Sequence, residues 1–113
     1  MWLSTGLTAR PIAYSGEFVQ YDYAVQGSTY SPARFHGRPD GAAVFIDNRP
    51  GNSGGWVYVS NSETENGGVG ALTFDRNGKV VDFRVVLSGT SWNCNVRVKK
   101  GRTDCHSRVL VLL

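Results

Sequence analysis

Residues 70–87 read GALTFDRNGKVVDFRVVL, and this stretch decides the fold class. Two β-prone runs, residues 70–74 and 80–87, flank a short segment, residues 75–78, that contains Asn-Gly. Asn-Gly between such runs is a strong hairpin signal, because both residues tolerate a positive φ. Residues 81–85 alternate apolar and polar side chains, which predicts one buried and one wet face. The stretch therefore predicts an antiparallel β-hairpin.

A second hairpin is expected upstream of the first. Residues 42–46 and 56–59 are short apolar runs, and the segment between them is rich in proline, glycine and asparagine. Such a pattern is typical of two strands joined by a long loop. No window shows the 3.6-residue period of an amphipathic helix. The chain is therefore expected to be all-β, with about five short antiparallel strands.

Length and composition describe one ordinary globular domain. The chain has 113 residues, of which 41% are hydrophobic and 19% are charged. These fractions exclude wholesale disorder, and the apolar runs are far shorter than the ~20 residues of a membrane-spanning helix. The first 14 residues show no secretory signal, and two cysteines cannot form a disulfide framework.

Positive charge is concentrated at the C-terminus. Residues 1–96 hold seven Lys and Arg against eight Asp and Glu, whereas residues 97–113 hold five against one. A basic tail of this kind is typical of proteins that bind nucleic acid or another polyanion. A solvated tail without a partner is the alternative.

Polar side chains are dense in residues 34–41. Arg34, His36, Arg38 and Asp40 fall within this segment, which also contains glycine and proline. A constrained loop with guanidinium, imidazole and carboxylate groups suits anion or metal binding. The structural alternative is a solvated loop with local ion pairs.

Two further residues follow predicted strands. Glu63 ends the polar segment 60–63, which follows the apolar run 56–59 directly, so it is expected at the rim of the sheet, where it could offer oxygen to a hard cation. Cys94 follows the second hairpin strand and could bind a transition metal as thiolate. The alternative for Glu63 is an acid on the surface without a ligand, and the alternative for Cys94 is a small buried apolar residue.

Taken in order, several segments resemble the N-terminal part of the PhoX-type alkaline phosphatases. The segments are YDYAVQGSTYSPARFHGRPDG (21–41), DGAAVF (40–45), GGWVYVSNSE (54–63), GGVGALTFDRNGKVVDFRVVLSGT (67–90) and NC (93–94). The resemblance extends roughly from Leu7 to Asn95. It implies a β-propeller, in relatives much longer than this chain, with a central cluster of iron and calcium ions that hydrolyses phosphate monoesters.

The resemblance also implies roles for single residues. Glu63 corresponds to a metal-ligand carboxylate of the family, and Cys94 to the cysteine that holds iron. The secondary candidates, for substrate binding, are Arg34, His36, Arg38 and Asp40. Relatives are typically exported, but residues 1–14 carry no export signal, so the compartment is not assigned.

The resemblance stops after Asn95. We therefore divide the chain into residues 1–95, the N-terminal part of a PhoX-like propeller domain, and residues 96–113, a basic tail that does not match. A shifted reading frame or an unspliced intron is our hypothesis for the tail. The chain is then expected to supply about one to two blades. Such a fragment is expected to be inactive by itself and to associate through unpaired strand edges.

Two other classes of function compete with this interpretation. The first is a non-catalytic β module that binds nucleic acid through the tail, although the tail lacks aromatic residues for base stacking. The second is a structural metal site made of Cys94, Cys105 and His106. Zinc sites need about four ligands with characteristic spacing, and no Cys-x-x-Cys pair is present.

Overall fold

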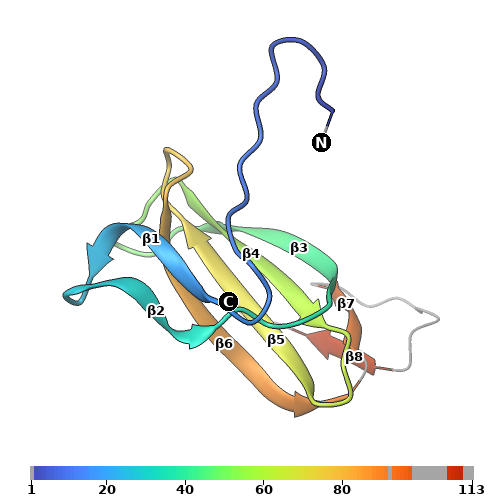
Figure 1. Cartoon of the computed structure of the whole chain (residues 1–113). Coiled ribbons are helices and arrows are strands. Elements are labelled where there is room, and N and C mark those ends of the chain that lie inside the picture. The colour runs from blue at the N-terminus through green and yellow to red at the C-terminus, as the bar shows by residue number, and fades with distance from the viewer. Residues whose placement is uncertain (1, 92, 98–106, 111–113) are drawn as a thin grey trace.

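The computed structural model describes residues 2–91, 93–97 and 107–110. Within these ranges the secondary structure is entirely β, which confirms the predicted all-β class, although there are eight strands where about five were expected (Figure 1). The strands are β1 (Phe18–Val25), β2 (Ser28–Arg34), β3 (Pro39–Asp47), β4 (Gly55–Ser62), β5 (Gly67–Phe74), β6 (Val80–Thr90), β7 (Asn93–Arg97) and β8 (Ser107–Leu110).

A four-stranded antiparallel sheet with the order β3-β4-β5-β6 is the centre of the molecule. Its strands pair in chain order, and both predicted hairpins are present, β3 with β4 and β5 with β6. Among the described strands the sheet stays open, with β3 and β6 at its edges. The described residues therefore show one four-stranded antiparallel sheet, beside two-stranded pairs, and no closed ring of blades.

The turn between β5 and β6 differs from the expected one. Only Gly78 has a positive φ, at 78°, and Asn77 does not. The Asp75 carboxylate accepts hydrogen bonds from the backbone N–H groups of Asn77 at 2.8 Å and Lys79 at 2.9 Å. Asp75 therefore organises a longer turn in which a single left-handed residue is enough.

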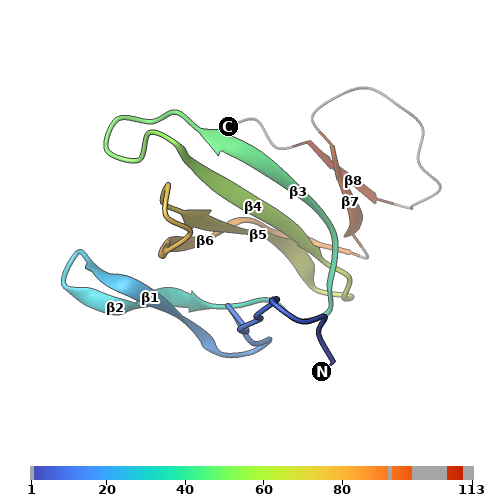
Figure 2. The same ribbon diagram turned by 90° about the horizontal axis from the view of Figure 1, so that it is seen from above.

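The β1–β2 hairpin forms a second layer on one face of the sheet (Figure 2). Apolar side chains from the hairpin and the sheet meet there in one buried cluster. Its members are Val19, Tyr21, Phe35, Leu72, Val80 and Phe83. Phe83 is completely buried, so the alternation predicted for β6 holds at its centre. Val85, however, is 46% exposed, because the hairpin does not cover that end of the strand.

Side chains of β1 also accept hydrogen bonds from backbone N–H groups on the outer edge of β6. The Asp22 carboxylate accepts a hydrogen bond from the Val80 backbone N–H at 2.7 Å. The Tyr21 hydroxyl accepts one from the Phe83 N–H at 3.2 Å and donates to Asp82 at 3.2 Å. Burial raises the pKa of Tyr21. These contacts attach the hairpin to the sheet without a shared backbone ladder.

The opposite face of the sheet carries a separate apolar cluster. Val57, Val59, Val69 and Ala71 are buried there, and β7 lies against β3 and β4. β7 pairs with β8 in parallel, so the expectation of antiparallel strands throughout was wrong for this pair. Parallel strands are not joined by a tight turn, so local turn signals are no guide to them.

The N-terminal residues extend away from the strands (Figure 1). Trp2 is fully exposed and Leu7 is 63% exposed, whereas Ile12 and Ala13 pack against the hairpin-side core. We call residues 2–11 the arm. No helix in the described part of the chain is long and apolar enough to cross a membrane.

Candidate functional site

Several predicted site residues meet at one end of the central sheet. β3 begins where β4 ends, because the two strands are antiparallel. The backbone N–H of Glu63 donates to the Arg38 carbonyl at 3.0 Å, and the Ser62 hydroxyl donates to the Gly37 carbonyl at 2.8 Å. Asp40 is the second residue of β3 and pairs with Asn61, next to the last residue of β4. We call this end of the sheet the polar rim.

Arg38 and Asp40 have exposed side chains at the polar rim. Arg38 has a positive φ of 45°, a strained backbone conformation for a residue other than glycine. Asp40 accepts a hydrogen bond from the next backbone N–H, that of Gly41, at 2.7 Å. Both side chains are therefore available to a ligand from solvent.

The predicted loop over residues 34–41 was only partly right. Arg34 is the last residue of β2, and β3 already begins at Pro39. The Arg34 guanidinium donates to the Gly16 carbonyl at 2.9 Å and lies 4.4 Å from the centre of the Phe18 ring. Arg34 thus makes its contacts within the hairpin layer, because its strand belongs to that layer.

His36 lies inside the junction between the hairpin and the sheet. Its Nε2 atom is 3.0 Å from the Ser60 hydroxyl, while its buried Nδ1 atom has no hydrogen-bond partner. The ring fits over Gly70, where an added Cβ would come within 2.6 Å of Nδ1. Burial lowers the pKa of His36, and the backbone of Asn61 partly opposes that shift. A neutral, packed imidazole suits a structural role better than the anion binding considered for it.

Asn61 is a polar rim residue that the sequence alone did not reveal. It is completely buried, and its Nδ2 group donates to the Gly41 carbonyl at 3.0 Å. Its Oδ1 atom has no hydrogen-bond partner. A buried oxygen without a partner costs free energy unless a ligand satisfies it. Asn61 pairs with Asp40 across β3 and β4 and is two residues from Glu63, which is half-buried.

Cys94 reaches the same end of the molecule through its strand. β6 ends next to the start of β5, where Thr90 pairs with Gly67, and β7 begins three residues later. β7 then lies against β3 and β4. The side chain of Cys94 lies outside the described parts of the chain, as do Cys105 and His106. In the described part, no three His, Cys, Asp or Glu side chains form a group that could hold a metal ion.

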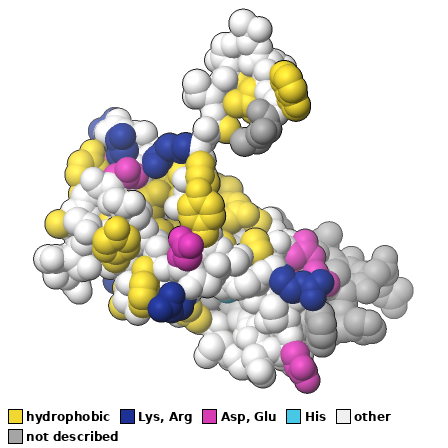
Figure 3. Space-filling view, viewed as in Figure 1, with side chains coloured by type: hydrophobic (Ala, Val, Ile, Leu, Met, Phe, Trp, Pro, Cys, Tyr) yellow, Lys and Arg dark blue, Asp and Glu magenta, His cyan; other side chains and the backbone are white. Residues whose placement is uncertain are grey.

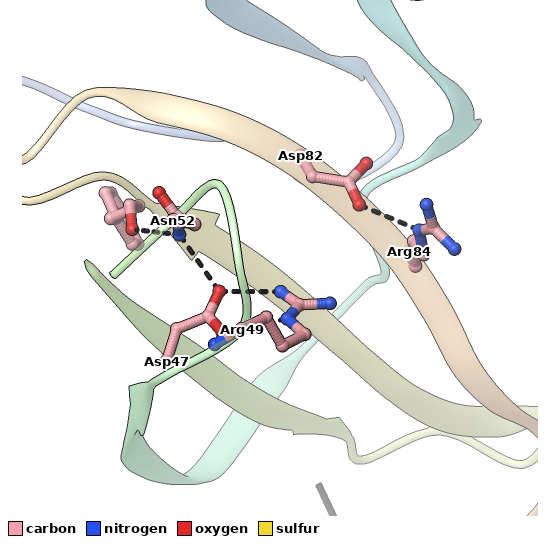
Figure 4. A network of polar contacts seen from close by, with 6 residues as sticks. Asp47, Arg49, Asn52, Asp82 and Arg84 are labelled. Carbon is pink, nitrogen blue, oxygen red and sulfur yellow. Dashed lines mark hydrogen bonds and ion pairs between the residues drawn. The ribbon is translucent and has the colours of Figure 1, made fainter. Parts of the chain in front are cut away.

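A second polar network lies at the opposite end of β3 (Figure 4). The Arg49 guanidinium donates to both oxygens of the buried Asp47 carboxylate, at 2.8 and 2.7 Å. Asn52 donates to the same carboxylate at 2.9 Å and to the Phe74 carbonyl at 3.1 Å. These bonds hold the pKa of Asp47 well below its usual range and raise that of Arg49. The carboxylate is thus fully engaged in fixing the β3–β4 loop.

Across a groove of about 550 Å³ from this loop, Asp82 pairs with Arg84 at 2.7 Å. Figure 4 shows the two pairs on separate elements, one at the end of β3 and the other on β6, each carboxylate facing its own arginine. Opposite charges therefore balance within the groove. On the face shown in Figure 3, the described acidic and basic side chains are likewise interspersed. The basic residues that suggested nucleic-acid binding lie in the tail, and residues 98–106 of it are outside the described ranges.

Comparisons with known proteins add no assignment to this geometry: no family model, no curated protein and no solved structure matches the chain.

Proposed function

We propose that this chain supplies one blade and part of the metal-binding site of a metal-dependent phosphomonoesterase of the PhoX type. The observation that supports the proposal best is the polar rim itself. There, Asp40 of β3 pairs with Asn61 of β4 in a four-stranded antiparallel sheet, and Glu63 follows β4 directly. A sheet of four consecutive antiparallel strands is also the unit from which propeller blades are built.

The donor atoms fit the metals that the family resemblance implies. The carboxylates of Asp40 and Glu63 and the unpartnered amide oxygen of Asn61 are hard ligands of the type that calcium prefers. A thiolate from Cys94 would suit iron. When bound, such cations neutralise charge on a phosphate ester and on the oxygens that attack and leave. Arg38, exposed beside them, would hold a substrate phosphate by charge-assisted hydrogen bonds.

The polar rim is incomplete as a catalytic site. Calcium takes about six to eight oxygen ligands, and the carboxylate and amide oxygens that the described part of the rim offers come from three residues, Asp40, Asn61 and Glu63. The remaining ligands would come from other parts of a longer protein. We therefore expect weak calcium binding and no phosphatase turnover by this chain alone.

Calcium titration of the chain, followed by amide chemical shifts in NMR spectra, tests the proposal. Backbone amides at Asp40, Asn61 and Glu63 are expected to shift with a roughly millimolar Kd. Glu63→Gln is expected to weaken binding about tenfold, whereas Glu65→Gln, an exposed acid two residues away, leaves it unchanged.

Two results would count against the proposal. Absence of calcium-dependent shifts at the polar rim would contradict the metal site. Metal-dependent hydrolysis of 4-nitrophenyl phosphate by the purified chain would instead contradict its incompleteness, and would show that the described strands suffice for the chemistry.

A further inference from the structure

The two edges of the central sheet are protected to different degrees. The outer edge of β6 is partly covered by Tyr21 and Asp22, and its pairing with β5 has three register shifts. Such irregularities and side-chain contacts are known means of preventing edge-to-edge association. β3 pairs with β4 in unbroken register from Ala42 to Asp47, and no described strand pairs with its other side. Within the described ranges β3 therefore presents a regular edge without a hydrogen-bonded neighbour, although β7 lies against the strand without pairing with it.

The side chains along this edge are apolar and well exposed. Residues 42–47 read AAVFID, with no charge before Asp47. Val44 is 63% exposed and Ile46 is 77% exposed, on the face that carries the hairpin layer. The hairpin packs toward β6 and does not cover them. Exposed, apolar edge strands with regular pairing are sites of strand addition.

We propose that β3 pairs in antiparallel fashion with β3 of a second copy, across a two-fold axis at Val44. In this register Val44 faces its own counterpart, Ala42 faces Ile46, and Ala43 faces Phe45. Asp47 faces Gly41, so no two like charges oppose each other. Apolar side chains meet apolar side chains at every inner position, which is the self-complementarity that a two-fold interface requires.

The pairing joins two four-stranded sheets into one continuous sheet. The hairpin layers of both copies then lie on the same face and far from the axis, because each packs toward its own β6. The proposal does not depend on metal binding or on phosphatase chemistry. Association through unpaired strand edges was expected from the sequence, and here the strand is β3, the partner is a second copy and the register is centred on Val44.

Sedimentation velocity over a dilution series tests the interface. The unmodified chain is expected to show a reversible monomer–dimer equilibrium. Val44→Lys places like charges at the axis and is expected to raise the dissociation constant of the dimer at least about tenfold. Val85→Lys is the matched control, since it introduces the same lysine at an exposed valine on β6 and leaves the dimer unchanged. A monomeric unmodified chain, or equal effects of the two lysines, overturns the proposal.

Disulfide trapping tests the register without a charged substitution. In a chain that carries Cys94→Ser and Cys105→Ser, Val44→Cys is expected to form a covalent dimer on oxidation, because its counterpart lies directly opposite. Ile46→Cys faces Ala42 and is expected to cross-link much less. Equal cross-linking at the two positions, or none at Val44, would show that β3 does not pair in this register.

Discussion

His36 makes the stability of the molecule sensitive to pH. Because burial lowers its pKa from the ordinary value of 6.5, the folded chain resists protonation that the unfolded chain accepts. Below about pH 6.5 the unfolded state therefore binds more protons, and the free energy of unfolding falls as the pH falls. The slope from one such group is at most about 1.4 kcal/mol per pH unit. Above about pH 6.5 the contribution is fully present.

Urea unfolding at a series of pH values between about 5 and 7.5 measures this slope. His36→Gln is expected to flatten it, whereas His106→Gln, which changes the other histidine of the sequence, retains it. The carboxylates act in a different range: the lowered pKa of Asp47 means that its contribution is lost only below about pH 4. An unchanged slope in His36→Gln would mean that the imidazole is not buried as described.

At the scale of elements, the attachment of the hairpin layer depends on Tyr21. Tyr21→Phe keeps the packed ring but leaves the buried Phe83 N–H without its acceptor. We expect a loss of about 1–2 kcal/mol in the free energy of unfolding and faster amide hydrogen exchange at Phe83. The Val80 amide, which Asp22 holds, is the internal reference. Tyr23→Phe, at a tyrosine that is 53% exposed, is the matched control and is expected to be neutral.

Local sequence signals predict some of the strand pairings and not others. The β5–β6 hairpin follows from its turn residues and its alternating strand. The β1–β2 hairpin was less visible, because its two-residue turn places Gln26 at a φ of 50° and Gly27 at 80°. Glutamine rarely takes the first position of such a turn, so the sequence carries no standard signal there.

For the whole molecule, we expect stability to depend little on the arm. Its apolar side chains are exposed, the chain first packs against the core just after it, at Ile12, and its ion pair, Arg10 with Asp22, is retained when only residues 2–9 are removed. Removal of residues 2–9 is therefore expected to change Tm by less than about 2 °C. A longer deletion that also removes Ile12 and Ala13 is expected to lower Tm by about 4 °C or more. Equal effects of the two deletions, measured by calorimetry, would contradict this division.

The polar rim shows how far sequence reasoning extends to a site. Glu63 was expected at a sheet rim because it follows an apolar strand, and it lies there. The sequence did not single out Asn61, and it could not reveal the packed surroundings of His36, because these are set by residues distant in sequence, such as Gly70 beside the imidazole. Strand ends can be inferred from local pattern, whereas the environment of a polar side chain depends on which layers cover it.

The central sheet separates two apolar clusters that share no member. One depends on the hairpin layer, whereas β7 lies against β3 and β4, and β4 supplies Val57 and Val59 to the other. The sheet therefore separates two apolar clusters that pack independently. A substitution in one cluster is expected to leave the packing of the other unchanged. A lineage could replace the whole C-terminal segment and still keep the hairpin, the sheet and the polar rim in place.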